Sequence, residues 1–286
     1  MKTRIIQRST GDTLLTINDP SSGSYITGKL AGLGLPAVRV TRGSYSGRPG
    51  GFSGKPEWEP RLITIDGLLI ADEVPLMQDR RRSFLAAFSG LEGVELHIDY
   101  ENGKSYLIYA ELIGTPELDY VPLDPLRAPF ALEFLANDPI IYDNTTGLTE
   151  LVPLGRREGG GFTYPIVYPI VYDPGGQPVN VPNTGDVEIF PVITLHGVAT
   201  NPVITNFSTG ESFALLNIKT ASYDVLTLDM NGPSVQLNGG NIYDAVAYQS
   251  NWLYLRRGDN FIALDTASDD DTVSGNISWR NGVLGI

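Results

Sequence analysis

The second half of the sequence repeats one short pattern, in which a few alternating apolar residues are followed by a turn rich in Gly, Asn or Asp. From residue 186 onward the pattern recurs about every ten residues, and no helical periodicity interrupts it. Short strands at such regular spacing are typical of a β-sandwich or jelly roll. The segments are VEIFPVITLHG, PVITNFSTG, SFALLNI, DVLTLDMNG, SVQLNGG, NWLYLRRGDNFIAL and GNISWRNG. We therefore predict an all-β second half.

The first half also contains strand patterns. Residues 94–112 alternate apolar and polar side chains on both sides of Asn102-Gly103, a pair that favours a two-residue type I′ hairpin turn. Residues 61–71 are predicted to form a strand, a turn at the Asp-Gly pair, and a second strand. In residues 130–143, Phe130, Leu132 and Phe134 are expected to share one strand face.

One helix is predicted, over residues 73–90, with a proline in its first turn and a glycine at its end. The residues expected to share its buried face are Met77, Phe84, Leu85 and Phe88. The consecutive Arg80, Arg81 and Arg82 fan around this helix. They favour a solvated face, and contact with an acidic partner surface is the alternative.

Residues 42–60 form a long stretch rich in Gly, Pro and Ser, with basic and aromatic residues interleaved. Such a length without periodicity suggests an extended segment. Because interfaces favour arginine and aromatic side chains, we interpret it as a subunit-interface arm, with an idle surface loop as the alternative. The candidate interface residues are Arg42, Arg48, Phe52, Lys55 and Trp58.

A domain boundary is predicted near residue 143, because an Asn-Asp-Pro sequence ends the preceding strand pattern and looser sequence follows. The first domain is expected over 1–143. The second is expected over 144–286 and begins with a connector, 144–182, that contains the doubled sequence YPIVYPIV. This duplication is too short and isolated to indicate a repeat fold.

Composition narrows the function. A formal charge of −13 argues against tight nucleic-acid binding, which depends on basic side chains. It suits a passage that DNA crosses without sticking, although many soluble proteins are acidic merely for solubility. The 32 Gly and 20 Pro favour turns over long helices. No apolar run is long enough for a membrane span, and the N-terminus has no secretory apolar region. With no Cys, synthesis in a cytosol is the simplest inference.

No motif nominates a catalytic, cofactor or metal site. His97 and His196 each lie in a separate strand pattern, and zinc sites need clustered His or Cys. Asp269, Asp270 and Asp271 lack the spacing of a calcium loop, so a solvated turn is preferred. We expect no enzyme activity and no cofactor.

Arg257-Gly258-Asp259 matches a known cell-adhesion tripeptide. Apolar residues precede and follow it, and Gly258 suits a strained turn position, so we predict a hairpin loop with Asp259 and Asn260 bonding locally.

Several segments, in order, resemble the distal tail proteins of siphophages, the phages with long, non-contractile tails. In the second half these are NTGDVEIFPVITLHGVATNPVITNFSTGE (183–211), DVLTLDM, VQLNGGN, WLYLRRGDNFI and ISWRNGVLGI. In the first half they are GLPAVRVTRG, RLITIDGLLI, the helix that follows it, and PFALEFLANDPIIYD. Each motif is loose alone, and the match depends on their order and spacing. The 144–182 connector departs from the family pattern.

The resemblance implies a mainly β protein with two domains: an N-terminal ring-forming domain of β-strands with one α-helix, and a C-terminal galectin-like sandwich. It implies a hexameric ring at the tail tip that joins the tail tube protein to the hub and to receptor-binding proteins or fibres, with DNA passing through it. The alternative function is a carbohydrate-binding module in which Trp252 or Trp279 stacks on a sugar, although a lone strand tryptophan is more often part of the core. A glycoside hydrolase is the weakest hypothesis, because no acid and nucleophile pair can be nominated.

Overall fold

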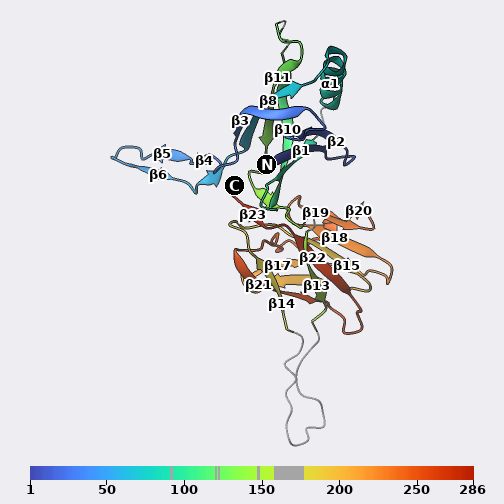
Figure 1. The fold of residues 1–286 in the computed structure, drawn as a ribbon. Coiled ribbons are helices and arrows are strands. Elements are labelled where there is room, and N and C mark those ends of the chain that lie inside the picture. Colours follow the sequence, from blue (N-terminus) through green and yellow to red (C-terminus); the bar gives the residue numbers. More distant parts are fainter. Residues whose placement is uncertain (91–92, 120, 122, 147–148, 158–176) are drawn as a thin grey trace, which may run out of the picture. The chain divides into compact units, whose positions relative to one another are not determined.

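The computed structural model forms two compact units (Figure 1), Met1–Gly147 together with Val283–Ile286, and Leu148–Gly282. The structure describes residues 1–90, 93–119, 121, 123–146, 149–157 and 177–286. The C-terminal residues Val283–Ile286, which we had grouped with the second domain, pack in the first unit. The doubled YPIVYPIV sequence lies outside the described residues.

The first unit is built on a nine-stranded sheet whose main path runs β2-β1-β9-β10-β11-β8-β3, with β12 and β23 joined off this path. Every pairing along the main path is antiparallel. Alternate side chains of the long strands enter a common core, which includes Ile65, Leu132 and Phe134. The strands are β1 (Lys2–Gln7), β2 (Thr13–Ile17), β3 (Ser24–Ala31), β8 (Arg61–Ile70), β9 (Gly93–Asp99), β10 (Ser105–Leu118), β11 (Arg127–Ala136), β12 (Ile141–Asp143) and β23 (Gly282–Val283).

The predicted helix is confirmed as α1 (Val74–Ala87). Met77, Phe84 and Phe88 are buried, and the Phe84 ring lies 5.2 Å from that of Phe130. Leu85 was wrongly placed on this face, since it is 51% exposed. At 3.6 residues per turn it lies about 80° around the axis from Met77, outside the buried stripe.

The arginines of α1 make contacts within the chain that neither interpretation foresaw. Arg80 donates to the Ile70 carbonyl, and Arg81 donates to the Asp119 carbonyl at 2.6 Å. Arg82 is exposed. Two of the three side chains therefore hold the helix to neighbouring backbone.

The turn predicted within residues 61–71 is wrong, because β8 runs unbroken through Gly67. Gly67 pairs with Phe130 of β11, and a Cβ at Gly67 would lie 2.2 Å from the Phe130 ring. The glycine therefore leaves room for an aromatic ring that crosses the strand, and does not mark a turn.

The 94–112 hairpin is confirmed as β9 and β10, with Ser105 opposite Asp99. Its turn differs from the prediction, because Gly103 has a φ of 83° whereas Asn102 is not among the residues with positive φ. A type I′ turn needs two positive φ values, so this connection is a longer loop with one glycine in the left-handed region.

The second unit is a β-sandwich of a six-stranded and a four-stranded sheet. Both sheets contribute to one core, including Ile277 from the first and Phe213 from the second. The six-stranded sheet has the order β13 (Glu150–Gly155), β22 (Ser274–Trp279), β15 (Val192–His196), β18 (Val225–Asp229), β19 (Ser234–Leu237) and β20 (Gly240–Asn241). The four-stranded sheet has the order β14 (Val179–Asn183), β21 (Gly258–Asp265), β16 (Val203–Asn206) and β17 (Glu211–Ala214). A short 3-10 turn, η1, spans Tyr243–Ala245.

The mainly β fold class, with one α-helix in the first unit and a C-terminal sandwich, is confirmed. The predicted connector needs correction, since its described part contains β13 and β14, which pair with β22 and β21 inside the sandwich. Among the described residues, no helix is long and apolar enough to cross a membrane.

Candidate assembly surfaces

An arm, defined here as residues 35–60, projects from the first unit (Figure 1). It consists of two short strand pairs, β4 (Val38–Arg39) with β7 (Glu57–Trp58), and β5 (Arg42–Ser44) with β6 (Gly51–Ser53). No residue from 37 to 60 is buried. The arm therefore has no core of its own.

All five predicted interface residues lie on this arm and are exposed. The structure brings Arg48 and Phe52 together through Tyr45. The Arg48 guanidinium lies 3.9 Å from the centre of the Tyr45 ring, and the Tyr45 and Phe52 rings are 5.8 Å apart. Sequence reasoning missed Tyr45, although an aromatic residue between two arginines was a usable signal.

The other three predicted residues do not join this stack. Arg42 lies opposite Ser53, and Trp58 lies opposite Val38. Lys55 has no ion pair among the described residues. Trp58 is 43% exposed and Phe52 is 53% exposed, so the arm presents large aromatic surfaces to its surroundings.

The root of the arm is held by Arg61, the first residue of β8, which is only 3% exposed. Its guanidinium donates to the carbonyls of Gly32 at 2.5 Å, Pro139 at 2.9 Å and Leu284 at 2.8 Å, and also to the carbonyl of Gly34. Burial lowers the pKa of this guanidinium. These four backbone carbonyls take the place of a carboxylate. Because they belong to segments far apart in the sequence, Arg61 connects three distant parts of the first unit.

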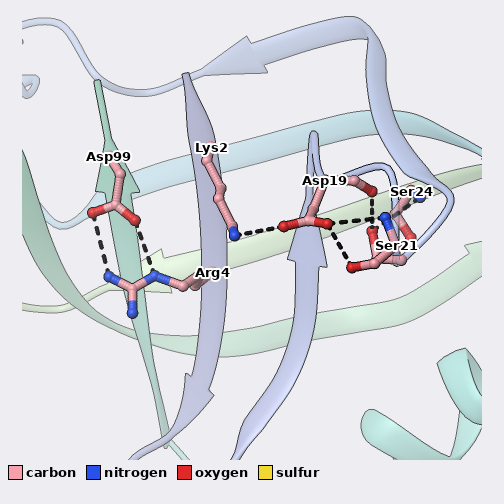
Figure 2. Close-up of polar contacts among 7 residues, drawn as sticks. Lys2, Arg4, Asp19, Ser21, Ser24 and Asp99 are labelled. Carbon is pink, nitrogen blue, oxygen red and sulfur yellow. Dashed lines mark hydrogen bonds and ion pairs between the residues drawn. The ribbon is translucent and has the colours of Figure 1, made fainter. Parts of the chain in front are cut away.

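Two ion pairs fix strand β1 beside its neighbours (Figure 2). Lys2 donates to Asp19 at 2.5 Å, and Arg4 donates to Asp99 at 2.9 Å. The bond from Lys2, aided by bonds from Ser21, holds the pKa of the Asp19 carboxyl well below its usual range. Desolvation raises the pKa of Asp99, but hydrogen bonds from Arg4 and Ser105 outweigh it and lower the pKa. These carboxylates are structural.

The two histidines lie apart, one in each unit. His97 is half-enclosed in β9, with Nε2 3.0 Å from Glu95 and Nδ1 3.3 Å from Asn144. His196 ends β15 and is exposed. Within the described ranges, no group of three His, Cys, Asp or Glu side chains is placed to hold a metal ion.

The acidic run 269–271 is not simply a solvated turn. Asp271 is 6% exposed and accepts hydrogen bonds from the backbone N–H of Thr200 at 2.7 Å and from its hydroxyl at 3.1 Å. Asp269 is exposed and accepts from Arg156 at 3.3 Å. Asp271 therefore ties the loop before β22 to the rest of the sandwich.

The Arg-Gly-Asp tripeptide is not a hairpin loop, because Gly258 begins β21, whose neighbours are β14 and β16. The strained position was predicted correctly, since Gly258 has a φ of 90°. Asn260 is fully buried, and its side chain bonds both the N–H and the carbonyl of Arg256. The tripeptide therefore lies where the chain enters β21, and the buried Asn260 side chain fixes the backbone there through its hydrogen bonds to Arg256.

The two tryptophans proposed for sugar stacking are not both accessible at the surface. Trp279 is 4% exposed and belongs to the sandwich core. Trp252 is half-buried, with its ring 4.9 Å from Phe213 and 6.2 Å from Tyr243. The carbohydrate-binding alternative therefore rests on Trp252 alone and stays a prediction.

Comparison with known proteins finds one family model that matches a stretch within the second unit. Residues 184–281 match the family model described as the siphovirus-type tail component, C-terminal domain. No curated protein matches the sequence.

Solved structures share the fold of almost the whole chain. The chain is similar to the Dit protein (gp 19.1) of phage SPP1, described as a paradigm of the hub adsorption apparatus in phages that infect Gram-positive bacteria. The identity is 14%, with a TM-score of 0.63 over 97% of this chain and 98% of that one. It is also similar to a chain of the phage P2 baseplate in its activated conformation with Ca, at 12% identity and a TM-score of 0.51 over 98% of each chain.

Proposed function

We propose that this chain, whose residues 184–281 match the siphovirus-type tail component family model, forms a hexameric ring at the tail tip. In this proposal it is a distal tail protein, a structural component of the virion and its baseplate, as the family match and the fold shared with the SPP1 Dit and P2 baseplate chains support. In our proposal the ring joins the tail tube protein to the hub and to receptor-binding proteins or fibres. The protein is made in the host cytoplasm, acts by shape and catalyses no reaction.

The observation that carries the ring proposal is the arm. An isolated two-stranded ribbon is at best marginally stable in water, and this one has no buried residue from 37 to 60. It nevertheless presents Phe52, Trp58 and Tyr45, side chains of the kind that interfaces favour. We propose that Arg42, Arg48, Phe52, Lys55 and Trp58 contact a neighbouring subunit.

The charge of the chain supports passage of DNA through the ring. At −13 per subunit, the chain offers little of the basic surface on which phosphate binding depends. Like-charge repulsion keeps a duplex from adhering to the wall of the ring. The genome therefore passes without specific binding.

The test is the oligomeric state with and without the arm. Val38 pairs with Trp58 and Arg39 with Glu57, so residues 40–56 can be replaced by Asn-Gly to close the β4–β7 pair with a two-residue turn. Light scattering after size exclusion should give a mass near six times 31.0 kDa for the complete chain and a monomer for the variant. Far-ultraviolet circular dichroism should show that both are folded.

A Tyr223→Ser variant serves as the control, since this 83% exposed side chain lies in the sandwich, and it should still form rings. Rings that survive removal of the arm would show that other surfaces hold the subunits together. A complete chain that stays monomeric, alone and with tail tube and hub proteins, would end the ring proposal.

A further inference from the structure

A groove runs between α1 and strand β2 in the first unit. It consists of two hollows of about 260 Å³ and 220 Å³ that share Leu14. The larger is lined by Leu69, Leu76 and Phe84, and the smaller by Phe88 and others. The groove therefore offers apolar side chains along the helix, interspersed with polar ones that include Ser24 and Asp79.

Strand β2 forms one wall of this groove and is the last strand on its side of the sheet path. Its hydrogen-bonded partner in the sheet is β1; on its other edge β2 pairs with no strand among the described residues, although β3 comes close to it at the Asp19–Ser24 bridge. Edges of this kind are sites where an extended segment of another chain can add.

A second observation points to an occupant. Ser24 lines the larger hollow and is 1% exposed, yet its hydroxyl has no hydrogen-bond partner within the described part of the chain. A buried hydroxyl is costly unless it is paired. Figure 2 shows Ser24 beside the loop that carries Asp19 and Ser21. An incoming polar group can satisfy this hydroxyl.

We infer that this groove receives the arm of a second copy of the chain, an inference that rests on the proposed ring. The side chains of the arm are chemically complementary to those that line the groove. The arm presents Tyr45 and Phe52 to the apolar side chains of the groove, and serine hydroxyls on either side of its tip to the Ser24 hydroxyl.

Charge fits the same pairing. Arg42 and Lys55 on the arm have no ion pair among the described residues, and Asp79, which lines the larger hollow, has none there either. Arg80 also lines this hollow, but its guanidinium already donates to the Ile70 carbonyl. The acidic group of the groove is thus available to a basic arm.

The placement of the two surfaces suits a closed ring. The arm follows the Ala31 end of β3, whereas Ser24 at the groove begins that strand. Figure 1 shows the arm and α1 on opposite sides of the first unit. A contact between two different faces of the same chain is heterologous, and such contacts generate rings when the rotation closes.

The absence of cysteine allows a direct test by cross-linking. One variant carries Ser46→Cys at the tip of the arm and Leu76→Cys at the groove, where the leucine is 39% exposed. The matched control pairs Ser46→Cys with Tyr223→Cys in the sandwich. A short bis-maleimide reagent is added to assembled rings, and denaturing gels report the products.

We expect the groove pair to give a ladder of covalent oligomers and the control pair to remain at least tenfold less cross-linked. Rings with no ladder from the groove pair, or with equal ladders from both, would overturn the groove assignment while leaving the ring proposal intact. If Leu76→Cys does not fold, Asp79→Cys on the exposed side of α1 replaces it. An unmodified chain that forms no ring would instead overturn the proposed function.

Discussion

At the residue scale, Arg61 is the most informative side chain of the first unit, because it is a buried cation that no carboxylate of the described residues neutralises. Its four carbonyl partners come from the root of the arm, the segment before β12 and the C-terminal residues. We predict that Arg61→Met destabilises the first unit by about 2 kcal/mol, since it removes the donor shared by four partly buried carbonyls. Chemical denaturation followed by circular dichroism measures this.

The control for Arg61 is Arg39→Met. Arg39 is ion-paired with Glu57 at 2.7 Å, but both side chains are about 60% exposed. Solvent screens exposed ion pairs and leaves them little net effect on stability, so this variant should unfold at nearly the same denaturant concentration as the wild-type chain. Equal losses from the two substitutions would show that the Arg61 clamp has no special role.

Asp271 makes the stability of the sandwich depend on pH. Desolvation raises the pKa of its carboxyl, but hydrogen bonds from Thr200 outweigh this, and the folded-state pKa lies below its ordinary value. The stabilisation is therefore fully present above the unfolded pKa of about 3.9 and is lost as pH falls through the lower, folded pKa.

We predict that Asp271→Asn lowers the free energy of unfolding at pH 7 and makes that free energy decline less steeply below about pH 4. Asp270→Asn, at the exposed neighbour, should change neither the free energy at pH 7 nor its decline. Urea unfolding from pH 7 to pH 2 measures both; parallel curves for the two variants would contradict the assignment.

At the element scale, the continuity of β8 depends on the space above Gly67. A Cβ there would meet the Phe130 ring at 2.2 Å, so we predict that Gly67→Ala destabilises the first unit by about 1–3 kcal/mol through overpacking. Gly155 in β13 is the matched control, because a Cβ there meets nothing within 4 Å and its φ is not in the left-handed region. Gly155→Ala should be neutral or slightly stabilising.

The reason for the Gly67 effect can be tested separately from its size. Phe130→Leu removes the ring that the new methyl group would meet, so the two substitutions together should cost less than the sum of their separate costs. Thermal unfolding of the four variants in this cycle provides the measurement. Strict additivity would indicate that Gly67 matters for backbone reasons alone.

At the scale of the whole molecule, the sequence predicted those helices and strands that depend on local residue patterns. The strands from residue 187 onward, the helix at 74–87 and the 93–118 hairpin follow from residues close together in the chain, whereas β13 and β14 fell in the stretch predicted as a connector. Some errors are local, such as the face of α1 assigned to Leu85, but others concern partners far away. Asp66-Gly67 reads as a turn until Phe130 is placed across it, 63 positions later. The burial of Arg61 was not predicted at all, and one of its acceptors, the Leu284 carbonyl, lies 223 positions later. Nothing local in the sequence encodes either contact.

The same limit applied to the assembly surface. The composition of residues 42–60 predicted an arm, because exposed aromatic and basic residues in an aperiodic segment are a local signal. The groove beside α1 gave no such signal, since its lining comes from α1 and from six strands, β1, β2, β3, β8, β9 and β10, that are far apart in the sequence. Leu14 and Leu76 read as ordinary strand and helix positions.

The division into two units leads to a final prediction about how the chain unfolds. Val283–Ile286 pack in the first unit, where Ile286 donates to the Leu33 carbonyl and Leu284 accepts from Arg61. Deleting residues 284–286 should therefore lower the stability of the first unit by roughly 1–3 kcal/mol and leave the sandwich unchanged.

Two spectroscopic probes report the unfolding of the two units separately. Ellipticity at 222 nm follows α1, the one α-helix of the described ranges, and in a Trp58→Phe background fluorescence comes from Trp252 and Trp279 of the sandwich. We expect the truncation to shift the first transition to lower denaturant while the second stays in place, because each unit has its own core. Coincident transitions that shift together would mean that the two cores unfold as one cooperative body.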